Sequence, residues 1–162
     1  WAEDRLVPDL VRAIDQGASL SIRHPASIRP WQHVLEPLSG YLALGQALLE
    51  GRPLAPAWNF GPAQGEALPV MEVVRRFQRH WPELQVQTDD GRHPHEAGVL
   101  KLDSREAFRQ LDWRPVWTAG QAIDRTAGWY RSFLDGNRHQ SLQDLAAYVA
   151  DARTTGLEWA RA

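Results

Sequence analysis

The 162-residue sequence contains no cysteine, and its 18 basic Lys and Arg residues include a single lysine, Lys101. The absence of cysteine excludes disulfides, thiol nucleophiles and Cys-based zinc sites. No apolar run approaches the ~18 residues that a membrane-spanning helix needs, and no signal peptide is recognisable. A net charge of -2 gives no strong field for nucleic acid or an acidic membrane. We therefore expect a cytoplasmic protein with neither nucleic-acid nor membrane partners.

Motifs of nucleotide-dependent catalysis are also missing. No Gly-x-Gly-x-x-Gly follows a predicted strand, and Gly61 and Gly65 lack the lysine that completes a Walker loop. No tyrosine is followed by lysine four residues later, because Tyr41, Tyr130 and Tyr148 precede Gly45, Leu134 and Ala152. The chain therefore lacks the Tyr-x-x-x-Lys pair that activates an alcohol for hydride transfer.

The hydrophobic content of 43% suits one domain or a large part of one. Apolar spacing and capping signals predict six helices, at residues 4–17, 34–49, 69–80, 103–111 and 118–133 and from residue 141. The second of these is expected to turn Leu38, Tyr41, Leu42 and Leu49 inward. Asp4 is expected to cap the first helix, and capping boxes are expected at Asp103/Glu106 and Thr118/Gln121.

Short strands are predicted at residues 20–22, 57–60 and 84–86, with an irregular loop from Arg23 to His33. Strands separated by helices indicate an α/β fold, but these are too few and too short for a complete doubly wound sheet. The strand at 58–60 needs a neighbour that this chain does not supply. The chain also begins at Trp1 instead of Met, so we expect a piece of a longer protein.

Three polar groups are candidates for chemistry. Arg29 lies in Ile28-Arg29-Pro30-Trp31 just before a helix, where a guanidinium on a stiff loop can hold phosphate; the alternative is a surface arginine stacked on Trp31. His33 and Glu36 could form a catalytic dyad, but capping and surface pairing are favoured. His93-x-His95, beside Asp89, Asp90 and Glu96, has metal-like spacing, yet no third ligand is clearly positioned, so we predict no metal site.

Several segments resemble the C-terminal half of CDP-glucose 4,6-dehydratases, which are extended short-chain dehydrogenases/reductases. They are Trp1-Ala2-Glu3-Asp4-Arg5-Leu6-Val7-Pro8-Asp9, Ile28-Arg29-Pro30-Trp31-Gln32-His33-Val34-Leu35-Glu36-Pro37-Leu38-Ser39-Gly40-Tyr41, Trp58-Asn59-Phe60-Gly61-Pro62, Pro94-His95-Glu96-Ala97 and Leu100-Lys101-Leu102-Asp103. The resemblance implies a mostly helical substrate-binding portion spanning 1–162, with the NAD-binding Rossmann half absent. It also implies a lyase that converts CDP-glucose to CDP-4-keto-6-deoxyglucose for deoxysugar and polysaccharide biosynthesis. The parent enzyme would be a homodimer and this chain alone inactive.

The resemblance also assigns substrate-binding roles, and no catalytic residue, within this chain. Arg29 aligns with the arginine that grips the nucleotide diphosphate, and Arg5 and Leu6 match a step bordering the sugar and phosphates. Arg23 stands where relatives vary with the nucleotide. The remaining assignments are weaker: Arg92 and His95 near the second phosphate or the hexose, and Gln64 near the phosphates. Glu96 departs from the family, which carries basic residues there.

Two alternatives remain open. The chain could come from another extended family member, a nucleotide-sugar epimerase or reductase. It could instead be a stand-alone nucleotide- or carbohydrate-binding module that uses its arginines and its eight tryptophans. Trp113, Trp117 and Trp129 are predicted to lie in the core, and Trp31 to anchor a loop.

Overall fold

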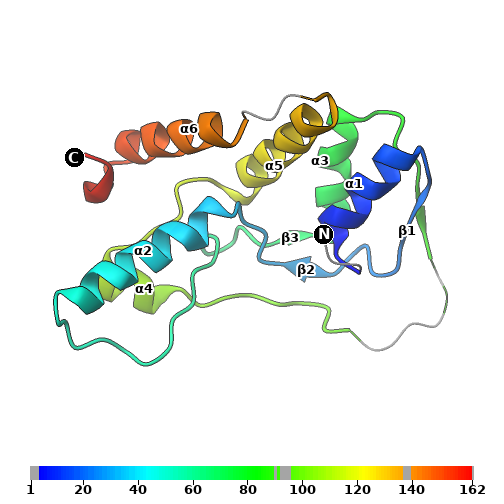
Figure 1. Cartoon of the computed structure of the whole chain (residues 1–162). Helices are drawn as coiled ribbons and strands as arrows, with labels where there is room; N and C mark the ends of the chain where they lie inside the picture. The colour runs from blue at the N-terminus through cyan, green and yellow to red at the C-terminus, as the bar shows by residue number, and fades with distance from the viewer. Residues whose placement is uncertain (1–3, 90, 92–95, 137–139, 162) are drawn as a thin grey trace.

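The computed structural model describes residues 4–89, 91, 96–136 and 140–161. Helices dominate this part of the chain, and four short strands accompany them (Figure 1). In chain order the elements are α1 (Leu6–Gln16), β1 (Leu20–Ile22), β2 (Ile28–Arg29), α2 (Leu35–Leu49), β3 (Leu68–Pro69), α3 (Val70–His80), β4 (Val86–Thr88), α4 (Arg105–Leu111), α5 (Ala119–Leu134), α6 (Gln140–Thr154) and the 3-10 helix η1 (Glu158–Ala160). No helix in the described ranges is long and apolar enough to cross a membrane.

The strands form two separate pairs. β1 runs parallel to β4, with Leu20 opposite Val86 and Ile22 opposite Thr88. β2 is antiparallel to β3, with Arg29 opposite Leu68, and Ile28 also bridges to Val99. The β2–β3 pair lies partly in a segment that the sequence predicted to be an irregular loop.

The predicted strand at 57–60 is absent. The indole of Trp58 donates to the Ala55 carbonyl at 2.8 Å, and the Phe60 carbonyl accepts from the Gln32 side chain at 2.9 Å. Side chains thus make hydrogen bonds here in place of a neighbouring strand. The strand predicted at 84–86 lies two residues later, because the Leu84 amide closes a turn onto the Trp81 carbonyl.

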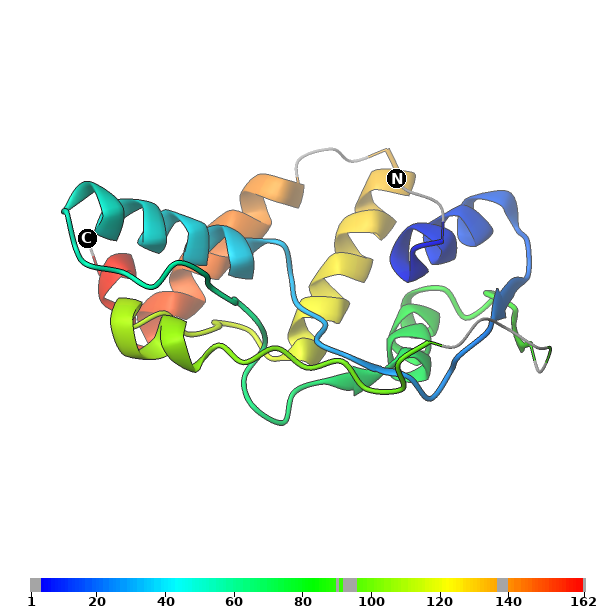
Figure 2. The same ribbon diagram turned by 90° about the horizontal axis from the view of Figure 1, so that it is seen from below.

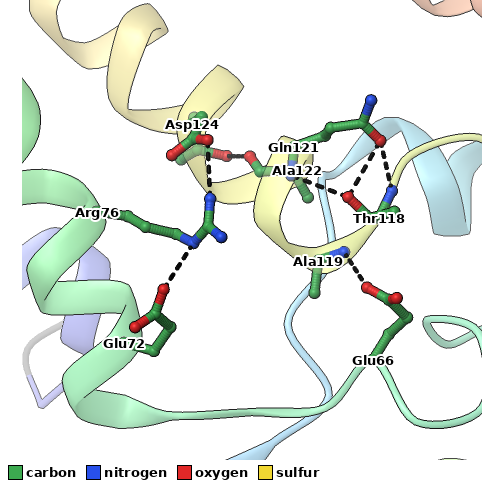
Figure 3. Close-up of polar contacts among 9 residues, drawn as sticks. Glu66, Glu72, Arg76, Thr118, Ala119, Gln121, Ala122 and Asp124 are labelled. Atoms are coloured by element: carbon green, nitrogen blue, oxygen red, sulfur yellow. Dashed lines mark hydrogen bonds and ion pairs between the residues drawn. The ribbon is translucent and has the colours of Figure 1, made fainter.

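Residues of α1, α3 and α5 form the main core. Helix α5 lies between α1 and α3 on one side and α2, α4 and α6 on the other (Figure 2). Val73, Val74 and Phe77 of α3 are fully buried, because apolar residues recur at helical spacing on one face. The Arg76 guanidinium donates to Glu72 of the same helix at 3.2 Å, and it joins α3 to α5 by donating to Asp124 at 2.8 Å (Figure 3).

The N-terminus of α5 confirms one predicted capping box. The Thr118 hydroxyl accepts from the Gln121 amide at 3.2 Å, and the Gln121 side chain accepts from the Thr118 amide at 2.9 Å. A carboxylate oxygen of Glu66 accepts from the Ala119 amide at 3.1 Å (Figure 3). Three backbone donors that a helix start leaves unpaired are therefore satisfied.

Two predicted caps are wrong. Arg5, not Asp4, precedes α1; Asp4 has a φ of 57°, and its carboxylate pairs with Arg23 at 3.2 Å instead of capping the helix. α4 begins at Arg105 after Ser104, and Asp103 accepts from the Arg105 amide and side chain instead of forming a box with Glu106.

Helix α2 exposes the face that was predicted to be buried. Its buried residues are Glu36, Gly40 and Ala47, because the Gly40 backbone packs closely against the Phe60 ring. The side chains predicted to face inward are exposed: Leu38 by 45%, Tyr41 by 59%, Leu42 by 76% and Leu49 by 92%. We call Leu38, Tyr41, Leu42 and Leu49 the exposed α2 face.

The tryptophan predictions hold in part. Trp113 and Trp117 are buried, as expected of core residues, whereas Trp129 is only half-buried. The Trp31 indole donates to the Leu68 carbonyl at 3.0 Å, and its ring packs against the main core. Trp31 is therefore a loop anchor that fixes the segment following Arg29.

Candidate functional site

A cavity of about 530 Å³ opens where the start of α1 meets β1 and β2. We call it the basic cleft, because it is lined by Arg5, Arg23, His24 and Arg29. Leu6, Leu20 and Ile22 supply apolar wall, and Asp4, Asp9 and Glu96 also line it. The structure thus brings four residues predicted from the sequence, Arg5, Leu6, Arg23 and Arg29, to one cavity.

Arg29 is positioned by the backbone of the strand pair. It lies in β2 opposite Leu68 of β3, and its guanidinium donates to the Ile28 carbonyl at 2.9 Å. The adjoining Pro30 and the anchored Trp31 indole restrict the backbone further. The Arg29 side chain is 16% exposed, so its charge sits at the cavity wall instead of extending into solvent.

Two arginines of the cleft, Arg29 and Arg23, are paired with carboxylates of the protein. A second guanidinium nitrogen of Arg29 donates to Glu96, and the His24 imidazole lies 3.8 Å from the other Glu96 oxygen. The hydrogen bond from Arg29 lowers the pKa of Glu96 below its usual range, and the nearby His24 and Arg23 act in the same direction. Arg23 in turn donates to Asp4 at 3.2 Å.

Gln64 lies elsewhere. It lines a separate cavity of about 780 Å³ together with Lys101, Arg105 and Arg114. Pro30 contributes to the walls of both cavities, so the two adjoin at the segment that follows Arg29. Arg92 and His95, the other predicted binding residues, lie outside the described residues.

Sequence reasoning missed His24 and Glu96 as members of the cleft. His24 directly follows Arg23, a proximity that was readable from the sequence. Glu96 reaches the cleft because the backbone at 98–100 runs beside β2: the Ile28 amide donates to the Gly98 carbonyl at 2.8 Å, and the Leu100 amide to the Ile28 carbonyl at 3.0 Å. Only the tertiary fold reveals this crossing.

His33 and Glu36 are not a surface pair. His33 is 7% exposed and Glu36 fully buried, and the Glu36 carboxylate accepts from the Val116 amide at 3.0 Å, the Trp117 amide at 2.8 Å and the Tyr148 hydroxyl at 2.8 Å. Burial raises the pKa of Glu36 and lowers the pKa of His33. These bonds give Glu36 a structural role joining α2 to α6.

Within the described ranges, no three His, Asp or Glu side chains gather as a metal site would require. The candidate ligands His93 and His95 lie outside those ranges.

The fold matches a known class. Similar structures are RMD from Pseudomonas aeruginosa complexed with NADPH (TM-score 0.63, 18% identity, covering 82% of this chain and 44% of that one) and dTDP-glucose 4,6-dehydratase from Bacillus anthracis in complex with NAD (0.61, 22%, 80% and 40%). A third is UDP-N-acetylglucosamine 4-epimerase from Bacillus cereus (0.55, 16%, 81% and 42%). Each match covers less than half of the solved chain, so this chain shares the fold of one portion of these proteins, and that portion is mostly helical with a few short strands, as the sequence predicted.

A relative of higher sequence identity gives a more specific comparison than the solved structures. CDP-glucose 4,6-dehydratase from Salmonella typhimurium is 43% identical over 138 residues, which cover 84% of this chain and 38% of that enzyme. The predicted resemblance to the C-terminal portion of CDP-glucose 4,6-dehydratases is therefore confirmed, and the chain spans well under half of that relative's length. No family model matches the chain.

Proposed function

We propose that the basic cleft binds the diphosphate of CDP-glucose, and that this chain is the substrate-binding part of an NAD-dependent 4,6-dehydratase. The observation that carries the proposal is the Arg29 guanidinium, fixed by the Ile28 carbonyl at the wall of a cavity that Arg5 and Arg23 also line. The planar fork of arginine matches two phosphate oxygens, and each charge-assisted hydrogen bond contributes roughly 1.5–3 kcal/mol.

The cleft's composition supports a ligand with an anionic centre and a less polar end. Leu20 and Ile22 of β1 line the cavity beside Arg23, which suits a nucleoside placed against the strand. Anchoring the diphosphate far from the reacting hexose lets its binding energy orient the sugar for the chemical step. The proposed product is CDP-4-keto-6-deoxyglucose, a cytoplasmic precursor for deoxysugars of polysaccharides.

The residues of this chain do not fit NAD. β1 continues into Arg23, His24 and Pro25, where a dinucleotide site would need a glycine-rich turn, and no tyrosine has a lysine four residues later. We therefore assign no step of hydride transfer to this chain. We propose that a separate Rossmann portion holds NAD, and that this chain therefore has no dehydratase activity by itself.

We propose that residues 1–162 form a substrate-binding half and that the exposed α2 face docks on the Rossmann half. Two observations support this occupant: the chain spans 38% of its Salmonella relative, and four large apolar side chains of α2 share one uncovered face. The assembled enzyme is proposed to be a homodimer through helices of the Rossmann half.

Co-expression of this chain with the unmatched portion of the Salmonella relative tests the docking proposal. Leu42→Asp is expected to abolish co-purification, because it places a charge at the centre of the contact. Leu145→Asp on α6, where Leu145 is 46% exposed, is the matched control and should retain it. Equal co-purification of both variants would overturn this use of α2.

Titration of the ¹⁵N-labelled chain with CDP, dTDP and glucose, followed by NMR, tests the substrate proposal. CDP should shift resonances of residues around the cleft more strongly than dTDP, and glucose alone should shift none. Arg29→Ala should weaken CDP binding by about 2–4 kcal/mol, whereas the exposed α3 variant Arg75→Ala should bind as the parent does. Unchanged CDP affinity in Arg29→Ala would show that Arg29 does not bind the ligand. Binding of glucose but not CDP would contradict the proposal that the cleft binds a nucleotide.

A further inference from the structure

One carboxylate lies where a phosphate would be expected in the basic cleft. Glu96 accepts a hydrogen bond from Arg29, the residue proposed to grip the diphosphate, and its second oxygen faces the His24 imidazole at 3.8 Å. Glu96 is far from Arg29 in the sequence, and it enters the cleft because residues 98–100 run beside β2. The cleft's best-positioned cation is therefore already paired with an anion of the protein.

This pairing contributes little to holding the fold together. The Glu96 side chain is 51% exposed, and ion pairs with a solvent-exposed partner typically contribute 0.2–1 kcal/mol. Arg29 does not depend on Glu96 for its position, because the hydrogen bond to the Ile28 carbonyl and the strand pairing with Leu68 fix it independently. The carboxylate can therefore leave Arg29 without disturbing the strand that carries it.

We propose that Glu96 is an internal competitor for the anion site: its carboxylate occupies Arg29 in the empty cleft and is displaced when a diphosphate binds. This inference rests on the proposed function. A diphosphate can displace Glu96 because it carries more negative charge and more acceptor oxygens than one carboxylate, and can also engage Arg5 and Arg23. Glu96 thereby lowers the affinity of the cleft for any anion that must displace it from Arg29.

NMR titrations of the whole chain with inorganic pyrophosphate and with CDP test the competitor role. Glu96→Gln removes the negative charge at nearly constant size, and it should tighten both ligands by about two- to fivefold, since neither has to break the ion pair. Glu96→Ala, which also removes the side-chain acceptor, should tighten them at least as much. Glu83→Gln, at an exposed position beyond α3, is the control and should leave affinity unchanged.

A double-variant cycle identifies the route of the effect. If Glu96 acts through Arg29, Glu96→Gln should give no tightening in an Arg29→Ala background. In the parent chain, the Glu96 side-chain carboxyl resonance should also shift on pyrophosphate addition, as the carboxylate leaves the guanidinium. Equal affinity of the parent, Glu96→Gln and Glu96→Ala for CDP would overturn the competitor role while leaving the proposed phosphate site intact. Absence of binding to all three folded proteins would overturn both.

Discussion

The Tyr148 hydroxyl donates a 2.8 Å hydrogen bond to the carboxylate of Glu36, which lies 112 positions earlier in the chain. Both side chains are buried, and Ser39 Oγ lies 3.0 Å from the same hydroxyl and accepts from the Trp113 indole at 2.9 Å. With the Val116 and Trp117 amides also bound to Glu36, a single carboxylate organises the junction of α2, α6 and the segment before α5.

Glu36→Ala should destabilise the protein by about 3–5 kcal/mol, because it leaves two backbone donors and a tyrosine hydroxyl without their acceptor inside the fold. Glu36→Gln should cost less, about 1–2 kcal/mol, since one carbonyl oxygen remains and the Tyr148 hydroxyl can rotate to accept. Urea unfolding of both variants measures the difference. Equal and small losses would show that the carboxylate does not carry this junction.

The raised pKa of Glu36 predicts a pH dependence of stability. Between the ordinary glutamate pKa of about 4.3 and the raised folded value, the folded state holds a proton that the unfolded state has lost. The free energy of unfolding should therefore fall as pH rises through this window. Subtracting the Glu36→Gln curve isolates the contribution of Glu36 from that of His33, whose lowered pKa acts in the opposite direction. A flat difference would contradict the prediction.

Two glycines of α2 form a matched pair. A Cβ added at Gly40 would lie 2.3 Å from the Phe60 ring, which Trp113 holds edge-on at a centroid distance of 5.0 Å. Gly40→Ala should therefore cost about 1–3 kcal/mol through overpacking. A Cβ at Gly45 would meet no atom within 4 Å, so Gly45→Ala should stabilise α2 by about 0.5–1 kcal/mol. Thermal unfolding that moves in the same direction for both would refute this account.

Removing the cap of α5 should weaken the main core from one end. Thr118→Ala deletes the hydroxyl that accepts from the Gln121 amide and should cost about 1 kcal/mol, whereas Thr118→Ser retains that acceptor and most of the stability. Chemical denaturation of the two variants provides the measurement. If serine fails to restore stability, packing of the threonine methyl group, and not capping, is what matters.

The sequence predicted the helices of the main core well. α1, α3 and α5 each bury one apolar face in a common core, and that is the condition under which helical spacing is informative. The same reasoning misplaced α2, because spacing identifies an apolar face without saying what covers it. Glu36 was assigned to capping or surface pairing because it lies at the start of a predicted helix, and its distant partners could not be read from the neighbouring residues.

The site was predictable only where its residues are local. Arg29 was identified from the adjoining Pro30 and the helix that follows, and the structure does place it with Arg5, Leu6 and Arg23 on one cavity. Gln64 was grouped with them although it lines the neighbouring cavity. The contact between Arg29 and Glu96 depends on a backbone crossing that brings together residues 67 positions apart, which no local pattern records.

Apolar packing is divided among three clusters: the main core, a group around Phe60, Ala107 and Trp113, and a group around Ala152, Leu157 and Ala160. Separately packed regions can open independently of global unfolding. Amide hydrogen exchange should consequently be graded along the molecule, slowest at Val73, Val74 and Phe77 and fastest near η1. Local unfolding near η1 would therefore leave the walls of the basic cleft in place.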